Sequence, residues 1–187
     1  MHWVLDLNPG TGTIKNKIKN YKKKMADPRI KFDLFSTYIA TIKNSVGTKM
    51  FRNIYVIENK RRRDVAKNGR VSCAAFVSSV LVISDNLIKS SHTTVKGLLE
   101  DMRESGWHKI DKPKKGAVLV WTPLKQMEDL SKDIISFPWE NEDRWHPGFY
   151  VGKNTAISNN SDSGTPTKHP WTYRKVDSIW WNDRLNN

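Results

Sequence analysis

The sequence is short of several residue types, and each shortage excludes a class of protein. Its 187 residues include a single cysteine, Cys73, so the chain can form neither an internal disulfide nor a zinc site built from cysteines. Its five histidines are scattered rather than clustered, which is not the spacing of metal ligands. We therefore assign no metal and no other cofactor.

Long apolar runs are missing as well, because no stretch reaches the length of a membrane span. Residues 1–13 lack the basic-then-apolar layout of a secretory signal. The Gly10–Gly12 pair lacks the glycine spacing and the Gly-Lys-Ser/Thr ending of a phosphate-binding loop. These absences predict a protein without a membrane span. They leave open a cytoplasmic protein, release or export to the cell wall by another route, or a leader that this sequence lacks.

Positive charge is abundant, and it is concentrated toward the N-terminus. The formal net charge is +13, with 17 Lys and Arg against 5 Asp and Glu before Cys73, and 15 against 14 from Cys73 onward. A basic N-terminal part favours contact with a polyanion such as nucleic acid, an anionic lipid surface or a cell-wall polymer. A solvated lysine-rich surface is an equally good interpretation. The run Lys60–Arg63 resembles a nucleic-acid patch, a pattern that short basic runs often match by chance.

Hydrophobic periodicity gives the order of the elements. Helices are expected at residues 14–25, 30–44, 73–88 and 95–103. Strands are expected at residues 117–121, 144–152 and 155–159 and within 171–181, with 160–168 as a polar loop, whereas 53–58 fits a strand or a helix. Helices followed by antiparallel strands predict an α+β fold. The first helix is amphipathic and lysine-rich, so we assign residues 1–33 to a basic extension and 34–187 to the main domain.

One stretch, Arg70–Val77, contains the only cysteine at the predicted start of an apolar helix. Ser72 is a suitable N-cap residue for that helix. A thiol in a first helical turn feels the partial positive charge of the free backbone N–H groups, which favours the thiolate. The same groups can hold a developing oxyanion. The alternative is that Cys73 is a small buried apolar residue.

Three motifs follow one another in the sequence: Ser72–Val77, Pro113–Trp121 and His146–Gly152, which reads His-Pro-Gly-Phe-Tyr-Val-Gly. Together they resemble the NlpC/P60 superfamily of papain-like cysteine peptidases and its CHAP amidase relatives. The resemblance covers roughly residues 68–160. It implies a papain-like fold in which N-terminal helices pack on a small antiparallel sheet. The chain departs from the family pattern at Ser72 and Ala117, where the family usually has Asp.

The resemblance also implies a set of catalytic residues. Cys73 would be the nucleophile and His146 the general base. A third polar residue, on the strand paired with that of His146, would orient the imidazole. We choose Asn159 for this role because an asparagine can accept from an imidazole N–H. Ser158 and His169 are the alternatives, since a register shift of one residue would turn Asn159 away.

The remaining histidines and tryptophans fit no motif. His92 and His108 are interpreted as structural. The later tryptophans are expected in the core, although several could line a groove for a sugar or a peptide backbone. They are Trp121, Trp139, Trp145, Trp171, Trp180 and Trp181.

The leading interpretation is a thiol hydrolase that cleaves amide bonds in peptidoglycan, as an endopeptidase or an amidase, or in a similar amide substrate. The basic N-terminal part would hold it near anionic wall polymers. One alternative is a catalytically inactive papain-like scaffold whose basic arm binds nucleic acid or an anionic polymer. Another is a cysteine-dependent acyltransferase or deamidase acting on a protein or a lipid. The sequence specifies neither the scissile bond nor the oligomeric state.

Overall fold

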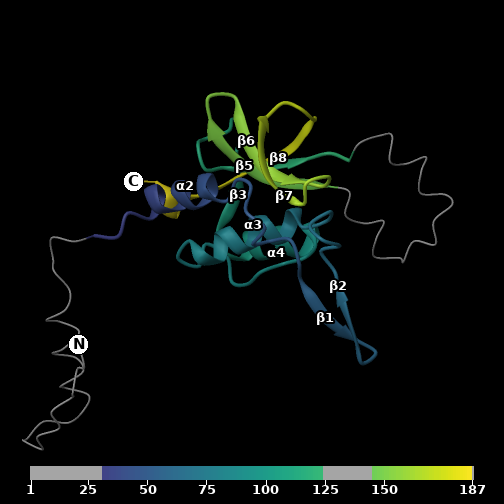
Figure 1. The fold of residues 1–187 in the computed structure, drawn as a ribbon. Coiled ribbons are helices and arrows are strands. Elements are labelled where there is room, and N and C mark those ends of the chain that lie inside the picture. Colours follow the sequence, from purple (N-terminus) through teal and green to yellow (C-terminus); the bar gives the residue numbers. More distant parts are fainter. Residues whose placement is uncertain (1–30, 124–144, 187) are drawn as a thin grey trace, which may run out of the picture. The chain divides into compact units, whose positions relative to one another are not determined.

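The computed structural model describes residues 31–123 and 145–186, and Figure 1 shows their arrangement. The amphipathic helix expected at residues 14–25 and Trp139 lie outside the described residues. From Leu34 onward the described residues belong to one compact unit. This unit combines helices with two antiparallel sheets, which confirms the predicted α+β class.

The elements of the described residues have the following bounds. The helices are α2 (Leu34–Asn44), α3 (Cys73–Ile83), α4 (Val95–Glu104) and the 3-10 helix η2 (Asp183–Leu185). The strands are β1 (Tyr55–Glu58), β2 (Arg61–Asp64), β3 (Trp107–Lys109), β4 (Val118–Trp121), β5 (His146–Gly152), β6 (Thr155–Asn160), β7 (Thr165–Pro170) and β8 (Val176–Asn182).

The main sheet contains six antiparallel strands in the order β3-β8-β4-β5-β6-β7. A tight turn joins β5 to β6, and its residues Lys153 and Asn154 have φ of 50° and 60°. Two successive positive φ angles are typical of the type I′ turns that match the twist of a hairpin. The register sets His146 opposite Trp121, and Gly148 opposite Ser158. The central strands therefore bring the residues of the third motif beside those of β4 and β6.

The hydrophobic core lies between this sheet and the helices, with α3 packed against β5 and β6 (Figure 1). Phe76 of α3 is fully buried, and its ring centroid lies 5.5 Å from that of Phe149 on β5 and 5.1 Å from that of Phe51. Tyr38 of α2 meets the same Phe149 ring edge-on at 5.8 Å. Its hydroxyl donates to the carbonyl of Gly116 at 2.8 Å, so the buried phenol has a partner. This aromatic cluster fixes α3 on the sheet.

Helix α3 ends earlier than its hydrophobic pattern predicted, at Ile83 rather than near Ile88. Asp85 and Asn86 follow with φ of 56° and 52°, a left-handed conformation that Asp and Asn tolerate better than most residues. Leu87 and Ile88 are nonetheless fully buried. The apolar pattern extends past the end of the helix because Leu87 and Ile88 fill the core from a loop. Periodicity alone does not distinguish a buried loop residue from a buried helical one.

The loop predicted at residues 160–168 was wrong in its second half, where β7 begins at Thr165. This strand pairs with β6 along its whole length and forms one edge of the sheet. Pro166 and Pro170 lie within it, and a proline lacks the N–H that an interior strand needs. Prolines are tolerated on an edge strand. The two prolines favoured a loop in the sequence analysis, because a local pattern does not show which strand lies at the edge of a sheet.

The uncertain segment 53–58 is a strand. Residues Tyr55–Glu58 form β1, which pairs with β2 in a separate two-stranded hairpin. In Figure 1 this hairpin extends away from the main sheet. The basic residues Arg61 and Arg62 are exposed on β2, and Arg63 beside them is half-buried.

Candidate active site

Cys73 is the first residue of α3 and is half-buried. Ser72 occupies the N-cap position, as expected from the sequence, although its side chain makes no capping hydrogen bond. Its hydroxyl donates instead to the carbonyl of Gly69 at 3.2 Å. The first-turn N–H groups are therefore not occupied by the Ser72 side chain. These donors at a helix N-terminus favour negative charge on a neighbouring group.

The turn before α3 is held in an unusual backbone conformation. Lys67, Asn68 and Gly69 have φ of 49°, 55° and 87°. A Cβ atom on Gly69 would lie 2.4 Å from the carbonyl oxygen of Gly164, so only glycine fits at this approach of two backbones. The carboxylate of Asp64 accepts from the N–H of Asn68 at 2.8 Å and closes the turn. The turn therefore directs the chain into α3 at Cys73.

His146 is the first residue of β5, and its Nε2 lies 2.8 Å from the hydroxyl of Ser158 on β6. The same hydroxyl lies 2.8 Å from Nε2 of His169 on β7. Nδ1 of His169 is 2.9 Å from the carbonyl oxygen of Pro170. Three adjacent strands thus carry one continuous line of hydrogen-bonding groups, His146–Ser158–His169, which ends on a backbone carbonyl.

Asn159 is the residue predicted to orient the imidazole. Within the part of the chain that the structure describes, no hydrogen bond joins its side chain to His146. It is buried, and its Nδ2 donates to the carbonyl of Gly69 at 2.7 Å. Successive side chains on a strand point to opposite faces, so Ser158 and Asn159 face different ways. Ser158, one of the two alternatives named from the sequence, is the residue at the imidazole. Asn159 instead ties β6 to the turn that precedes Cys73.

Gly148 makes the close pairing of His146 and Ser158 possible. It lies directly opposite Ser158 in the register. A Cβ on Gly148 would be 2.6 Å from the Cβ of Ser158 and 2.9 Å from the indole of Trp121. The glycine of the His-Pro-Gly motif therefore leaves the space that the Ser158 side chain needs.

Trp121 forms the floor of this cluster. It is fully buried, and its ring centroid lies 5.9 Å from that of His146, 5.4 Å from that of His169 and 5.3 Å from that of Tyr173. Its indole N–H donates to the carbonyl of Trp171 at 2.7 Å, which fixes the ring. The two imidazoles and the phenol are therefore held around one rigid aromatic side chain.

Burial sets the protonation states of the two imidazoles. Desolvation lowers the pKa of His146 to about 3, and the positive charges of Arg174 and His169 act in the same direction. Desolvation also lowers the pKa of His169, against a smaller opposing effect of its bond to Pro170 and together with the charge of Arg174. Both rings are consequently neutral at pH 7. A neutral imidazole has one nitrogen that donates and one that accepts.

Tyr173 links this cluster to Cys73. Burial raises the pKa of the Tyr173 phenol. The phenol also interacts with the Ser158 side chain, and the charge of a Cys73 thiolate acts on it. Its ring lies 4.2 Å from that of His169. Helix α3, which begins at Cys73, packs on β5 and β6, the strands that carry His146 and Ser158. The sequence analysis missed Tyr173, because it lies after β7 in a segment that carries no motif.

The other tryptophans are divided between core and partly exposed positions. Trp121, Trp180 and Trp181 are buried, as expected for core residues, and so is Trp107. Trp145 and Trp171 are only partly buried and pack against the core from its edge. Trp145 directly precedes His146 in the chain.

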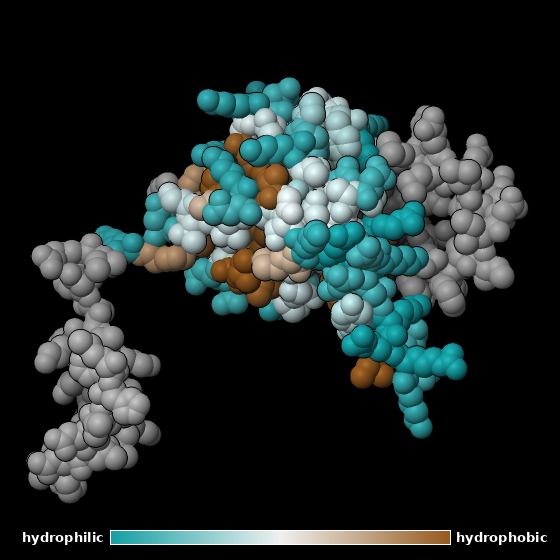
Figure 2. Space-filling model, viewed as in Figure 1, coloured by the Kyte–Doolittle hydropathy of each residue, from teal (hydrophilic) through white to brown (hydrophobic). Residues whose placement is uncertain are grey.

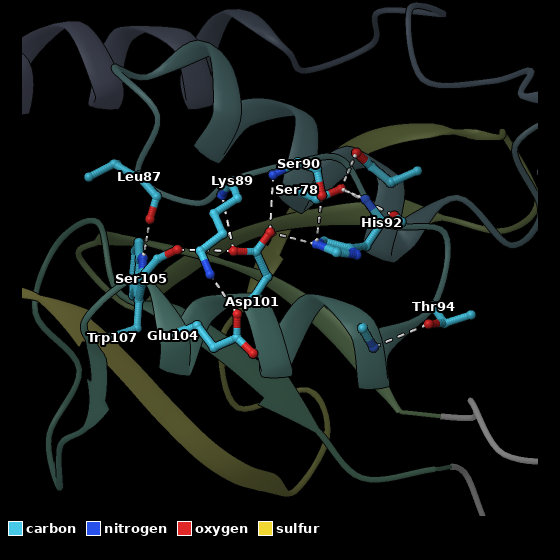
Figure 3. Close-up of polar contacts among 12 residues, drawn as sticks. Ser78, Leu87, Lys89, Ser90, His92, Thr94, Asp101, Glu104, Ser105 and Trp107 are labelled. Atoms are coloured by element: carbon cyan, nitrogen blue, oxygen red, sulfur yellow. Dashed lines mark hydrogen bonds and ion pairs between the residues drawn. The ribbon is translucent and has the colours of Figure 1, made fainter.

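A second polar cluster surrounds Asp101 of α4 (Figure 3). Its carboxylate accepts from the backbone N–H groups of Lys89 and Ser90, both at 3.0 Å. It also contacts Nε2 of His92 at 2.7 Å and the hydroxyl of Ser105 at 2.9 Å. Burial alone would raise the pKa of Asp101, but these hydrogen bonds lower it to about 2. The cluster ties the loop after α3 to α4, which agrees with a structural role for His92.

Among the described residues, His, Cys, Asp and Glu form no group of three or more that could hold a metal ion. None of the helices in residues 31–123 and 145–186 has the length and the apolar run needed to cross a membrane. No protein-family model matches the chain, and no curated protein matches it either.

Proposed function

We propose that this protein is a papain-like cysteine hydrolase of the NlpC/P60 type that cleaves amide bonds, with Cys73 as the nucleophile, His146 as the general base and Ser158 as the residue that positions His146. The single observation that carries this proposal is the bond between Nε2 of His146 and the hydroxyl of Ser158. It engages one ring nitrogen and leaves Nδ1 as the nitrogen that can take a proton from Cys73 at the start of α3.

The reaction would proceed in two stages. Nδ1 of His146 takes the thiol proton, and the thiolate sulfur attacks the carbonyl carbon of the amide. The oxygen then carries negative charge, which the first-turn N–H groups of α3 stabilise. His146 returns the proton to the departing nitrogen, the C–N bond breaks, and a thioester with Cys73 remains. Water attacks this thioester, gives its proton to His146 and releases the acid, and the thiol is regenerated.

The substrate class rests on the family resemblance and on charge. Peptidoglycan stem peptides, or the junction between sugar and peptide, present amide bonds in a polymer that carries anionic partners. The 17 Lys and Arg before Cys73 suit a surface of that charge. The same residues would serve a cysteine-dependent acyltransferase or deamidase, in which an amine replaces water or ammonia is the leaving group.

Digestion of purified peptidoglycan, with the products identified by mass spectrometry, tests this proposal. The wild-type protein should release peptide fragments, and Cys73→Ala and His146→Ala should not. His108→Ala is a matched control, because His108 is exposed on β3 at the opposite end of the sheet from β7. It should leave digestion unchanged. Digestion by Cys73→Ala would rule out the mechanism.

A polyanion-binding module is the second candidate, because the β1–β2 hairpin has the required chemistry. Figure 2 shows a largely hydrophilic surface over this hairpin. Its exposed Tyr55 has the guanidinium of Arg62 4.6 Å above the ring, and Ile57 beside it is 81% exposed. Arginine with an exposed aromatic ring is the combination that binds phosphate backbones and stacked bases.

This second function predicts binding to single-stranded DNA that weakens with salt. Arg62→Glu should weaken binding and reduce the slope of log affinity against log salt by roughly one unit or less per lost phosphate contact. Arg103→Glu in α4 is the control for a general change of charge, since Arg103 lies outside the hairpin. Equal effects of the two variants would count against a dedicated site on the hairpin.

A further inference from the structure

His169 lies one step beyond the catalytic residues proposed above, and its contacts determine where its own proton is. Nδ1 of His169 lies 2.9 Å from the carbonyl oxygen of Pro170. A carbonyl oxygen can only accept, so Nδ1 carries the hydrogen. In the neutral ring Nε2 is then a bare acceptor. A backbone atom therefore fixes the tautomer of His169.

The tautomer of His169 in turn determines where the hydrogens of Ser158 and His146 lie. Ser158 lies 2.8 Å from Nε2 of His169, so its single hydrogen must point to that nitrogen. Its oxygen then accepts from His146, whose Nε2 is 2.8 Å away. The hydrogen of neutral His146 is consequently on Nε2, and the lone pair is on Nδ1. This is the nitrogen that must be bare if His146 is to accept the proton of Cys73.

We propose that His169 is a positioning residue that selects the catalytically competent tautomer of His146, and that its protonation switches the site to the incompetent one. This inference rests on the proposed function, because only a base facing Cys73 makes the choice of tautomer matter. It assigns regulation by pH to a residue that does not touch the substrate.

The switched state follows from the same contacts with one proton added. Protonated His169 carries hydrogen on both nitrogens, so its Nε2 donates to Ser158. The Ser158 hydroxyl then points to Nε2 of His146, and the hydrogen of neutral His146 is on Nδ1. His146, Ser158 and His169 together then hold one proton more than in the neutral state, and this is the proton that His169 gained. Nδ1 of His146 can no longer accept from Cys73.

The groups that face His169 are consistent with a switch in acid. Its ring is half-buried, so protons reach it from solvent. The Tyr173 ring lies 4.2 Å from it at a tilt of 60°, the Trp121 ring lies 5.4 Å away, and the positive charge of Arg174 acts on both imidazoles. Burial and Arg174 both oppose protonation. The competent tautomer is therefore the one present at neutral pH.

Long-range proton–nitrogen NMR of the full chain, which reads histidine tautomers directly, tests this inference. At pH 7.5 the wild type should show hydrogen on Nε2 of His146. As pH falls, that signal should convert to the Nδ1 form with the same midpoint as the titration of His169. A His146 tautomer that ignores this titration would overturn the inference.

Three variants separate selection of the tautomer from a structural role. His169→Gln keeps an acceptor for Ser158 but cannot be protonated, so His146 should hold the Nε2 hydrogen down to lower pH. His169→Leu offers no acceptor, and alkylation of Cys73 by iodoacetamide at pH 7.5 should fall roughly 10- to 100-fold, at or below the low end of a general base's contribution. His169→Lys offers a permanent donor and should show the Nδ1 form at pH 7.5.

Each outcome bears on one of the two proposals. Identical tautomers and alkylation rates in the Gln, Leu and Lys variants would overturn the role of His169. A wild-type Cys73 that does not react, in a protein that shows the coupled change of tautomer, would overturn the hydrolase. That same result would uphold His169 as the residue that selects the tautomer of His146.

Discussion

Neighbouring residues of β6 have separate tasks at the residue scale. The Ser158 hydroxyl contacts the imidazole of His146 at 2.8 Å, whereas Nδ2 of Asn159 donates to the carbonyl of Gly69 at 2.7 Å. The contact of Ser158 determines which nitrogen of His146 carries the proton. The bond of Asn159 holds the turn that leads into α3. Removing Ser158 should therefore affect the reactivity of Cys73 through His146, whereas removing Asn159 should chiefly affect stability.

Ser158→Ala should slow alkylation of Cys73 at pH 7.5 by roughly 10-fold or more, because His146 loses the group that fixes its tautomer. The free energy of unfolding of this variant should also fall, because the buried Ser158 hydroxyl contacts both imidazoles. Asn159→Ala removes a buried hydrogen bond and should lower the free energy of unfolding in urea by about 1–3 kcal/mol. An Asn159→Ala protein of unchanged stability would contradict the structural role assigned to Asn159.

The buried imidazoles make stability depend on pH. The pKa of His146 is about 3 in the folded protein, against an ordinary value of about 6.5 in the unfolded chain. Below pH 6.5 the unfolded state therefore binds more protons, and stability falls as pH drops toward 3. The slope from this one group approaches about 1.4 kcal/mol per pH unit.

The pH dependence is measured by urea unfolding at pH 7 and pH 4.5. The wild type should lose stability between these values, and His146→Gln should lose less, since glutamine does not titrate. His169 adds to the loss in the same direction, because its pKa is also lowered by burial. Equal losses in the wild type and His146→Gln would contradict a buried neutral imidazole at this position.

At the scale of elements, the turn before α3 determines where Cys73 lies. It combines three successive residues of positive φ with a backbone approach at Gly69 that leaves no space for a Cβ. A side chain at this position must move the turn or the Gly164 backbone. A small displacement there is transmitted to the first turn of α3, where both the thiol and the N–H groups are located.

Gly69→Ala should therefore destabilise the protein by more than the roughly 1 kcal/mol that positive φ alone costs a non-glycine residue, and it should slow alkylation of Cys73. Gly47→Ala is the matched control. Gly47 has φ of 75°, but a Cβ there meets no atom within 4 Å. Alanine at Gly47 therefore has the backbone strain of a positive φ but no steric clash of its Cβ. Equal stability losses in the two variants would show that the close approach at Gly69 is unimportant.

At the scale of the whole molecule, the features predicted from the sequence are those that depend on local patterns. The α+β class, the helix at Cys73 and the pairing of β5 with β6 followed from periodicity and from a two-residue turn, which are local signals. The edge position of β7 and the burial of Leu87 in a loop depend on contacts between distant segments. Local patterns do not contain that information.

The candidate site divides in the same way. Cys73 and His146 are within quoted motifs and could be named from the sequence. The choice between Ser158 and Asn159 depends on a one-residue register, which the paired strands β5 and β6 decide. Tyr173 joins the cluster only through the fold, since it follows β7 in a segment without any motif. Motifs named the proposed reactive residues, and the fold showed which side chains contact His146.

The central claim is that His146 activates Cys73, and the rate of Cys73 alkylation by iodoacetamide tests it most directly. The chain has one cysteine, so intact mass reports this site alone. At pH 7.5 we predict that His146→Ala reacts roughly 10-fold or more slowly than the wild type, whereas the exposed His108→Ala reacts at the wild-type rate. Equal rates in the wild type and His146→Ala would contradict the account.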